Sequence, residues 1–252
     1  MLNSVMGTTA KRLVAIELVL CALLATSAGS QKAASPPATE SRPSLTLEYA
    51  GNSRTYESFI PDLEGPLPVV LLLHGSGRNG QVMIDAWKDL ATKQHFILVA
   101  PNSYDPSGWG VKMDPPEFLH AVVAQVEAKH AIDEKRIYLF GHSAGAVYGL
   151  ILAVIDSHFF AAVAAHAGAL PHGYEDAVFA RADRRTPIAI WVGSLDALFH
   201  VDDVKATKHL FQAKGFPVEL SVIPNHDHNY YAISDAVNAK AWDFLKAVRL
   251  GP

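Results

Sequence analysis

Short runs of apolar residues recur along this chain in a pattern typical of strands that alternate with helices. Before the first run, residues 45–49 and 55–60 alternate between apolar and polar positions and are joined through Gly51-Asn52, which predicts a β-hairpin. Residues 69–73 are then all apolar, as expected for a strand that is buried on both faces of a sheet.

Similar runs and intervening helical spacing continue to the end of the chain. Strands are predicted at 96–100, 137–140, 160–165, 187–192 and 218–223. Helices are predicted at 80–93, at 115–129 with Asp114 as its cap, directly after Gly145, at 201–214 and at 230–248. The alternation predicts an α/β fold: a mainly parallel sheet with helices on both faces, the N-terminal antiparallel hairpin, and a site in the loops at the carboxyl ends of the strands. The irregular stretch 167–185 is placed to cover a pocket.

Length and composition narrow the class of protein. The chain has 252 residues, half of them hydrophobic, which is enough for one α/β domain with a large core. A net charge of -4 argues against nucleic acid or an anionic membrane surface as a partner.

The N-terminal region has the pattern of an export signal. Lys11 and Arg12 precede a mostly apolar run, and small residues for cleavage end at Ala28, so we expect a signal peptide over 1–28, a flexible linker over 29–44 and a catalytic domain over 45–252. A retained N-terminal anchor is the alternative, and no integral membrane span is expected after cleavage. Cys21 is the only cysteine, and the bulky Leu20 before it disfavours lipid attachment there. The expected location is outside the cell or in the periplasm, and the mature chain would have neither a thiol nor a disulfide.

A G-x-S-x-G motif, residues 141–145, lies between an apolar run and a segment of small residues. This context of strand, sharp turn and helix is the one in which such a serine acts as a nucleophile. Gly141 and Gly145 are expected because a strained turn leaves no room for side chains there. The motif makes Ser143 the candidate nucleophile and the Ala144 amide a candidate oxyanion donor.

A candidate acid and two candidate bases follow the serine, in the order found in hydrolases that carry this motif. Asp196 comes just after the predicted strand 187–192, while His226 and His228 both follow the last strand. Spacing does not choose between the two histidines. His226-Asp227-His228 offers no complete ligand set for zinc, so no metal is predicted.

Other residues near the predicted carboxyl edge have weaker assignments. The amide of Ser76, with Gly77 as an addition, is a candidate oxyanion donor, while His74, His142 and His166 are interpreted as structural. Aromatic residues in the predicted upper loops are candidates for lining a substrate pocket, with core packing as the alternative: Trp109, Phe199, Tyr230 and Tyr231. Neither a phosphate-binding loop nor a dinucleotide fingerprint is present, so no cofactor is predicted.

Together the segments 72–77, 108–110, 132–138 and 141–145 resemble the α/β-hydrolase superfamily, and within it the secreted polyhydroxybutyrate-depolymerase and feruloyl-esterase group. The resemblance runs from about Leu45 to the end of the chain. The run 227–231 is similar to a D-H-S-Y-Y segment of S-formylglutathione hydrolases in which the histidine is catalytic, and this implies that His228 is the base.

The resemblance implies a serine esterase that acts through an acyl-enzyme. The chain leaves no room for a polymer-binding module and lacks the disulfides of many feruloyl esterases, so small or medium esters are the expected substrates. Alternatives are an acyltransferase or peptidase on the same fold, and a non-catalytic binding protein with a hydrolase scaffold.

Overall fold

The computed structural model describes residues 44–171, 173 and 175–251. The predicted signal peptide and almost all of the predicted linker lie outside the described residues. The strands are β1 (Leu45–Tyr49), β2 (Asn52–Phe59), β3 (Leu67–Leu73), β4 (Ile97–Pro101), β5 (Ile132–His142), β6 (Ala162–His166), β7 (Ile188–Gly193) and β8 (Val218–Ile223). The helices are α1 (Gly80–Gln94), α2 (Pro116–Glu127), α3 (Ala144–Ile155), α4 (Glu175–Phe179), α5 (Val201–Ala213) and α6 (Ser234–Leu245).

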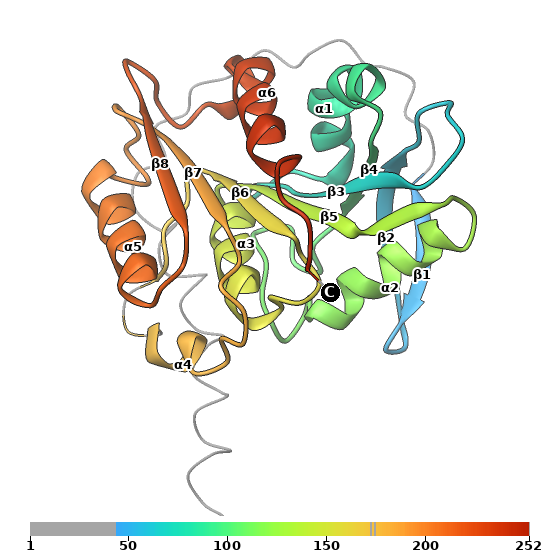
Figure 1. Ribbon diagram of the computed structural model, residues 1–252, viewed down its shortest axis with the longest axis horizontal. Helices are drawn as coiled ribbons and strands as arrows, with labels where there is room; N and C mark the ends of the chain where they lie inside the picture. Colours follow the sequence, from blue (N-terminus) through green and yellow to red (C-terminus); the bar gives the residue numbers. More distant parts are fainter. Residues whose placement is uncertain (1–43, 172, 174, 252) are drawn as a thin grey trace, which may run out of the picture.

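All eight of these strands form one sheet, in the order β1-β2-β4-β3-β5-β6-β7-β8 (Figure 1). The pairs β1/β2 and β2/β4 are antiparallel, and the remaining pairs are parallel. The predicted α/β fold with its N-terminal antiparallel hairpin is thus confirmed.

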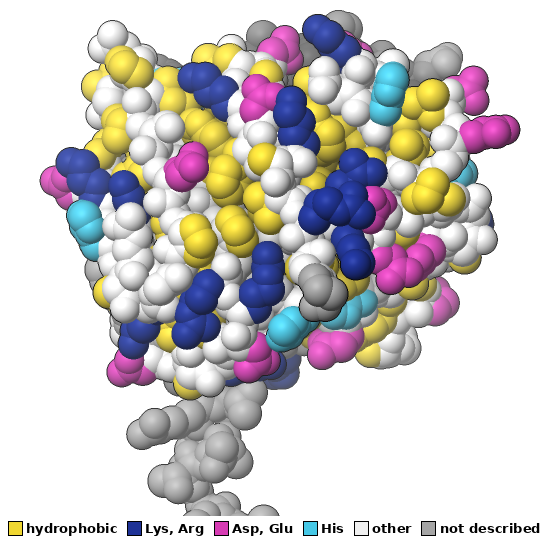
Figure 2. All heavy atoms as spheres, viewed as in Figure 1, with side chains coloured by type: hydrophobic (Ala, Val, Ile, Leu, Met, Phe, Trp, Pro, Cys, Tyr) yellow, Lys and Arg dark blue, Asp and Glu magenta, His cyan; other side chains and the backbone are white. Residues whose placement is uncertain are grey.

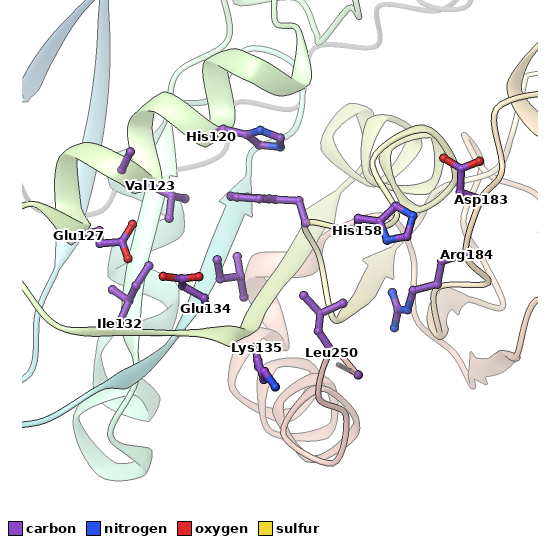
Figure 3. A pocket seen from close by; sticks show the side chains of 14 residues that line it. His120, Val123, Glu127, Ile132, Glu134, Lys135, His158, Asp183, Arg184 and Leu250 are labelled. Atoms are coloured by element: carbon purple, nitrogen blue, oxygen red, sulfur yellow. The ribbon is translucent and has the colours of Figure 1, made fainter.

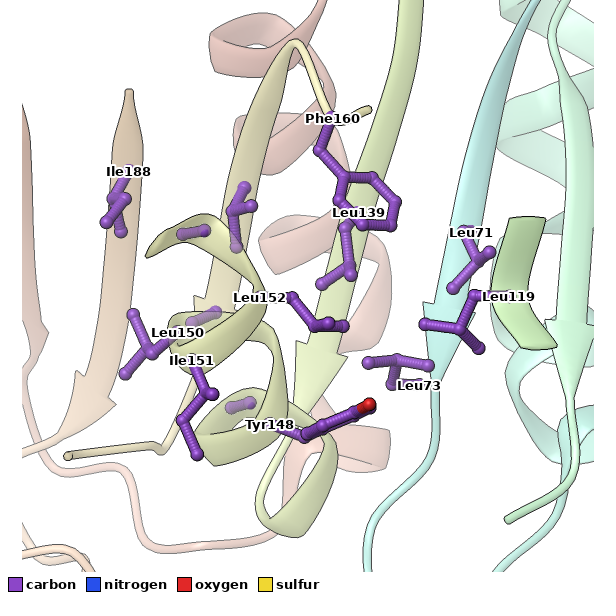
Figure 4. Close-up of a cluster of buried hydrophobic side chains, with 14 of the residues drawn as sticks. Leu71, Leu73, Leu119, Leu139, Tyr148, Leu150, Ile151, Leu152, Phe160 and Ile188 are labelled. Carbon is purple, nitrogen blue, oxygen red and sulfur yellow. The ribbon is translucent and has the colours of Figure 1, made fainter. Parts of the chain in front are cut away.

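Helices cover both faces of the sheet. On one face, α1 and α6 pack side by side over a core that includes Trp87, Phe140 and Trp242 (Figure 1). On the other face lies a larger core to which α2, α3, α4 and α5 contribute. Figure 4 shows α3 packed against the sheet there, with Leu150 and Leu152 directed into a cluster that includes Leu139. Because α3 begins directly after Ser143, this packing fixes the position of the serine.

Two predicted helices differ from the structure by more than one residue at an end. The helix predicted at 115–129 is α2, and Pro115 rather than Asp114 is its N-terminal cap residue. Asp114 is instead 1% exposed and pairs with Arg54 at 2.5 Å, so the prediction of a cap there is wrong. A buried carboxylate needs a charged partner more than a helix end needs a side-chain cap.

The C-terminal segment predicted as one helix is divided. Residues Tyr230–Ala232 form a 3₁₀ turn, and α6 starts only at Ser234, because Ile233 has φ −133°, outside the helical range. In the stretch predicted to be irregular, α4 forms, and its Val178 and Phe179 are buried in the core.

The surface carries charges of both signs. On the face shown in Figure 2, basic and acidic side chains are interspersed. Within the described residues, no helix combines the length and the apolar character needed to cross a bilayer.

Candidate active site

Ser143 occupies a strained turn between the end of β5 and the start of α3. Its φ of 55° and ψ of −120° lie in a region that L-residues rarely adopt. The flanking glycines are required by close approach: a Cβ on Gly141 would lie 2.2 Å from the carbonyl oxygen of Gly145, and one on Gly145 would lie 2.3 Å from that of Leu73. The turn therefore lifts the serine hydroxyl above the carboxyl end of the sheet.

A continuous chain of hydrogen bonds joins Ser143, His228 and Asp196. The Nε2 atom of His228 lies 3.0 Å from Ser143 Oγ, and its Nδ1 atom lies 2.9 Å from Asp196 Oδ2. An ionised carboxylate only accepts, so Nδ1–H donates to Asp196 and the Nε2 lone pair faces the serine hydroxyl. This arrangement can withdraw the proton from Ser143.

The structure brings His228, and not His226, to the serine. The His226 imidazole is buried, packs edge-on against His166 with ring centres 5.6 Å apart, and leaves its Nε2 atom without a partner in the described part of the chain. Its backbone carbonyl accepts from the Leu195 amide at 2.8 Å. His226 thus holds two loops together behind the site.

Asp196 is positioned by the loop between β7 and α5. Its Oδ1 atom accepts the amides of Leu198 and Phe199, each at 2.9 Å, while Oδ2 contacts His228. Burial opposes ionisation of this carboxyl, but the hydrogen bonds from His228 and from these amides prevail and lower its pKa. A buried charge is therefore kept next to the imidazole.

The loop after β3 approaches Ser143 from the other side. A Cβ on Gly75 would lie 3.2 Å from the Ser143 Cβ. The Gly77 amide donates to the Pro106 carbonyl at 2.7 Å, which removes it as an oxyanion donor. Among the described residues, no hydrogen bond occupies the amides of Ser76 and Ala144, so these two predicted donors have amides that remain open to a ligand.

His74 stabilises this loop from below, as predicted for a structural histidine. Its Nδ1–H donates to the Gly75 carbonyl at 2.9 Å, and its Nε2 accepts from the Ser103 amide at 3.2 Å. Its own carbonyl accepts from the Trp109 indole at 2.9 Å. Burial lowers the pKa of His74, more than its bond to Gly75 raises it, and so favours the neutral ring that these contacts require.

His142 and His166 form a neutral pair behind the catalytic edge. Paired across β5 and β6, they place their Nδ1 atoms 3.1 Å apart, so one ring donates and the other accepts. Burial, with the neighbouring histidines, lowers the pKa of His166 to about 3 and that of His142 well below its usual range. His142 lies 5.0 Å from His228, ring centre to ring centre.

The predicted substrate contacts at Trp109 and Tyr230 are wrong, because both side chains are buried. Trp109 is 2% exposed and stacks on Tyr148, in the core. Tyr230 is fully buried, with its hydroxyl accepting from Trp87 at 2.8 Å and donating to Asn238 at 2.5 Å. Among the four predicted pocket aromatics, Phe199 is the one with a ring contact to the base: it is partly exposed, and its ring lies 5.8 Å from that of His228.

Arg54 in β2 supports the site in a way that the sequence pattern did not predict. Its guanidinium bonds the carbonyls of Asn102 and Met113 and the carboxylate of Asp114. The Tyr148 hydroxyl of α3 donates to the Asp114 carbonyl. The pair thus joins the hairpin to the loop beside His74, and its partners are too far apart in sequence for a local pattern to reveal them.

A cavity of about 890 Å³ lies elsewhere, at the amino ends of the parallel strands. Figure 3 shows His120 and Glu127 from α2, Glu134 from β5, Arg184 and Leu250 around it. Because Ser143 stands at the carboxyl end of β5, this cavity is separate from the hydrogen-bonded chain at the serine. In the described residues, no group of three or more His, Cys, Asp or Glu side chains could hold a metal ion.

The sequence that forms this site matches a known protein family. The dienelactone hydrolase family profile matches residues 84–247, more than half of the chain and a range that includes Ser143, Asp196 and His228. The chain belongs to the dienelactone hydrolase family.

Relatives of this family member include feruloyl esterase B of Neurospora crassa. It is 30% identical over 152 residues, which cover 55% of this chain and 50% of the relative. The chain spans about half the length of the curated relatives it matches. The predicted resemblance to feruloyl esterases is confirmed.

Solved structures share the fold of this dienelactone hydrolase family member. A ferulic acid esterase from Anaeromyces mucronatus, solved with ferulic acid, matches with a TM-score of 0.66 at 19% identity, over 85% of this chain and 93% of the other. An S-formylglutathione hydrolase from Staphylococcus aureus matches with a TM-score of 0.65 at 16% identity, over 81% and 95%. The predicted α/β-hydrolase fold is confirmed.

Proposed function

We propose that this protein is a secreted serine hydrolase that cleaves small or medium carboxylic esters through an acyl-enzyme. The observation that supports it most is the His228 imidazole, held 3.0 Å from Ser143 Oγ and 2.9 Å from Asp196 Oδ2. The kinship with a feruloyl esterase supports the choice of an ester as substrate. The predicted likeness to polyhydroxybutyrate depolymerases stays a prediction from the sequence.

The reaction begins with attack on the ester carbonyl. His228 Nε2 takes the Ser143 proton while Oγ bonds the carbonyl carbon. The oxyanion receives hydrogen bonds from the Ser76 and Ala144 amides, and Asp196 stabilises the imidazolium that has formed. The imidazolium then gives its proton to the leaving alcohol, which departs and leaves an acyl group on Ser143.

Water completes the cycle. His228 removes a proton from a water molecule as the water oxygen attacks the acyl carbon, and it returns the proton to Ser143 Oγ as the carboxylic acid leaves. These reaction steps need no cofactor, because every proton moves between His228 and a reacting oxygen.

Hydrolysis of 4-nitrophenyl acetate and butyrate by residues 29–252 tests the proposal. We expect a burst of nitrophenolate followed by steady turnover, as an acyl-enzyme requires. Ser143→Ala should remove the burst and lower kcat by about 10⁶-fold with an unchanged far-UV spectrum. Turnover by folded Ser143→Ala near the wild-type rate would contradict the proposal.

The export leader is a separate part of the proposal. We infer that residues 1–28 direct secretion and are removed, that 29–44 form a linker, and that 45–252 form the catalytic domain, on the basis of the basic-then-apolar pattern before Ala28. N-terminal sequencing of the full chain expressed in an exporting bacterial host should begin at Gly29. A first residue of Met1 on exported protein would contradict cleavage.

A further inference from the structure

The loop between β7 and α5 carries exposed apolar side chains and places one of them, Phe199, beside the catalytic base. Residues 194–200 include Leu195 and Leu198, which are 62% and 57% exposed, and the partly exposed Phe199. Exposed apolar side chains that gather on one surface often mark a contact site for a ligand or a partner. The loop's ionisable groups are the buried Asp196 and the terminal His200.

The carboxylate that orients His228 also fixes this loop. Asp196 Oδ1 accepts both the Leu198 and the Phe199 amides at 2.9 Å, while Oδ2 contacts His228 Nδ1. One buried carboxylate therefore fixes both the backbone that carries Leu198 and Phe199 and the orientation of the imidazole. Phe199 also packs on the core, which restrains its ring.

The Phe199 ring lies nearly parallel to the imidazole of His228. Their centres are 5.8 Å apart and their planes differ by 18°, the geometry of an offset stack. A partly exposed ring in this place adds an apolar surface next to the imidazole that delivers the proton.

The reaction decides which part of the ester meets this surface. In the tetrahedral intermediate, one oxygen faces the Ser76 and Ala144 amides, and the leaving oxygen must lie within hydrogen-bond reach of His228 Nε2. The acyl chain, bonded to the same central carbon, points in a third direction. The group nearest to Phe199 is therefore the alcohol part of the ester.

We propose that Phe199, together with Leu198, forms the wall of the alcohol side and selects esters of apolar alcohols, aromatic ones above all. This inference rests on the proposed function, since it assigns one half of the substrate to one residue. An aromatic alcohol gains a stacking partner there, whereas a charged alcohol would lose hydration without finding a counter-ion in the loop.

Two ester series separate this assignment from general loss of activity. The alcohol is varied in methyl acetate and benzyl acetate, and the acyl group in methyl acetate and methyl hexanoate, with acid release followed in a pH-stat. Phe199→Ala should lower kcat/KM for benzyl acetate about tenfold more than for methyl acetate. The ratio of methyl hexanoate to methyl acetate should stay within about twofold of the wild-type ratio.

Two further variants serve as controls. Phe199→Leu keeps an apolar side chain without the ring and should fall between the wild type and Phe199→Ala, which guards against a misfolded alanine variant. Leu63→Ala removes a 46% exposed leucine from the loop before β3, at the opposite edge of the sheet, and should change neither ratio.

Different results would overturn the assignment of Phe199 and the proposed esterase function. Folded Phe199 variants with an unchanged ratio of benzyl to methyl acetate, or with an equal loss in the acyl series, overturn the inference while esterase activity stands. A wild-type protein that hydrolyses none of the three esters overturns the proposed function and this inference with it.

Discussion

Two His–Asp pairs lie at opposite edges of the sheet and have the same length. His228 contacts Asp196 at 2.9 Å at the carboxyl edge, and His120 contacts Asp156 at 2.9 Å near the amino-edge cavity. Their surroundings differ. The second nitrogen of His228 meets Ser143, whereas His120 stacks on Phe159 with ring centres 3.9 Å apart.

A His–Asp pair and a large cavity do not by themselves make an active site. The Asp196 side chain is fully buried and that of Asp156 is 12% exposed, so the first pair is better shielded from water. The carboxyl-edge pair also meets a strained serine and two open amides. Nucleophilic catalysis requires the base, the serine and the oxyanion donors in one place. The cavity lined by His120 has no such combination of groups among the described residues.

The largest expected effect separates the two histidines. His228→Ala should lower kcat by about 10⁶-fold because Ser143 loses its base, while His120→Ala should leave kcat for 4-nitrophenyl acetate unchanged. Steady-state kinetics on both folded variants provides the measurement. Equal losses would mean that the amino-edge pair takes part in turnover.

The matched aspartates should differ by less. Asp196→Asn keeps the volume but supplies an amide that favours the wrong imidazole tautomer, and kcat should fall about 10⁴-fold. Asp156→Asn should affect only the local contact with His120. Activity of Asp196→Asn near that of the wild type would show that the carboxylate does not orient His228.

The smallest expected effect concerns pH and stability. His166 has a folded pKa of about 3 against an ordinary 6.5, so between these values the unfolded chain binds the extra proton. The free energy of unfolding should therefore fall as the pH drops through this window, by about 1.4 kcal/mol per pH unit for each such histidine. Urea unfolding at pH 6.5 and 4.5 measures this.

His166→Asn sharpens that prediction, since it keeps a polar atom near His142 but cannot take up the proton. Its stability should depend less steeply on pH than that of the wild type. Parallel curves for the two proteins would contradict the buried-histidine account.

The sequence predicted the fold because its signals are local. The apolar runs of β3 and β5, and the glycines around Ser143, report burial and crowding in their own segments. The burial of three residues depends instead on partners that lie far away in the sequence. Asp114 pairs with Arg54, Trp109 stacks on Tyr148, and Tyr230 accepts a hydrogen bond from Trp87. An aromatic residue in a loop has the same local pattern whether it faces substrate or core.

The choice between the two histidines of the last loop shows the same limit. His226 and His228 are two residues apart, and which of them reaches the serine depends on the backbone path of the loop. Asn225 has φ 55° there, and the His228 carbonyl accepts from the Tyr230 amide at 2.9 Å. No residue spacing encodes that path, so only resemblance pointed to His228.

The most direct test of the central claim is labelling of residues 29–252 with a fluorophosphonate, followed by peptide mass mapping. We expect an adduct on Ser143 that persists in His226→Ala and is lost in His228→Ala, because, of these two histidines, only His228 contacts the serine hydroxyl. Absence of an adduct on the folded wild-type protein, or loss of the adduct with His226 instead of His228, would contradict that claim.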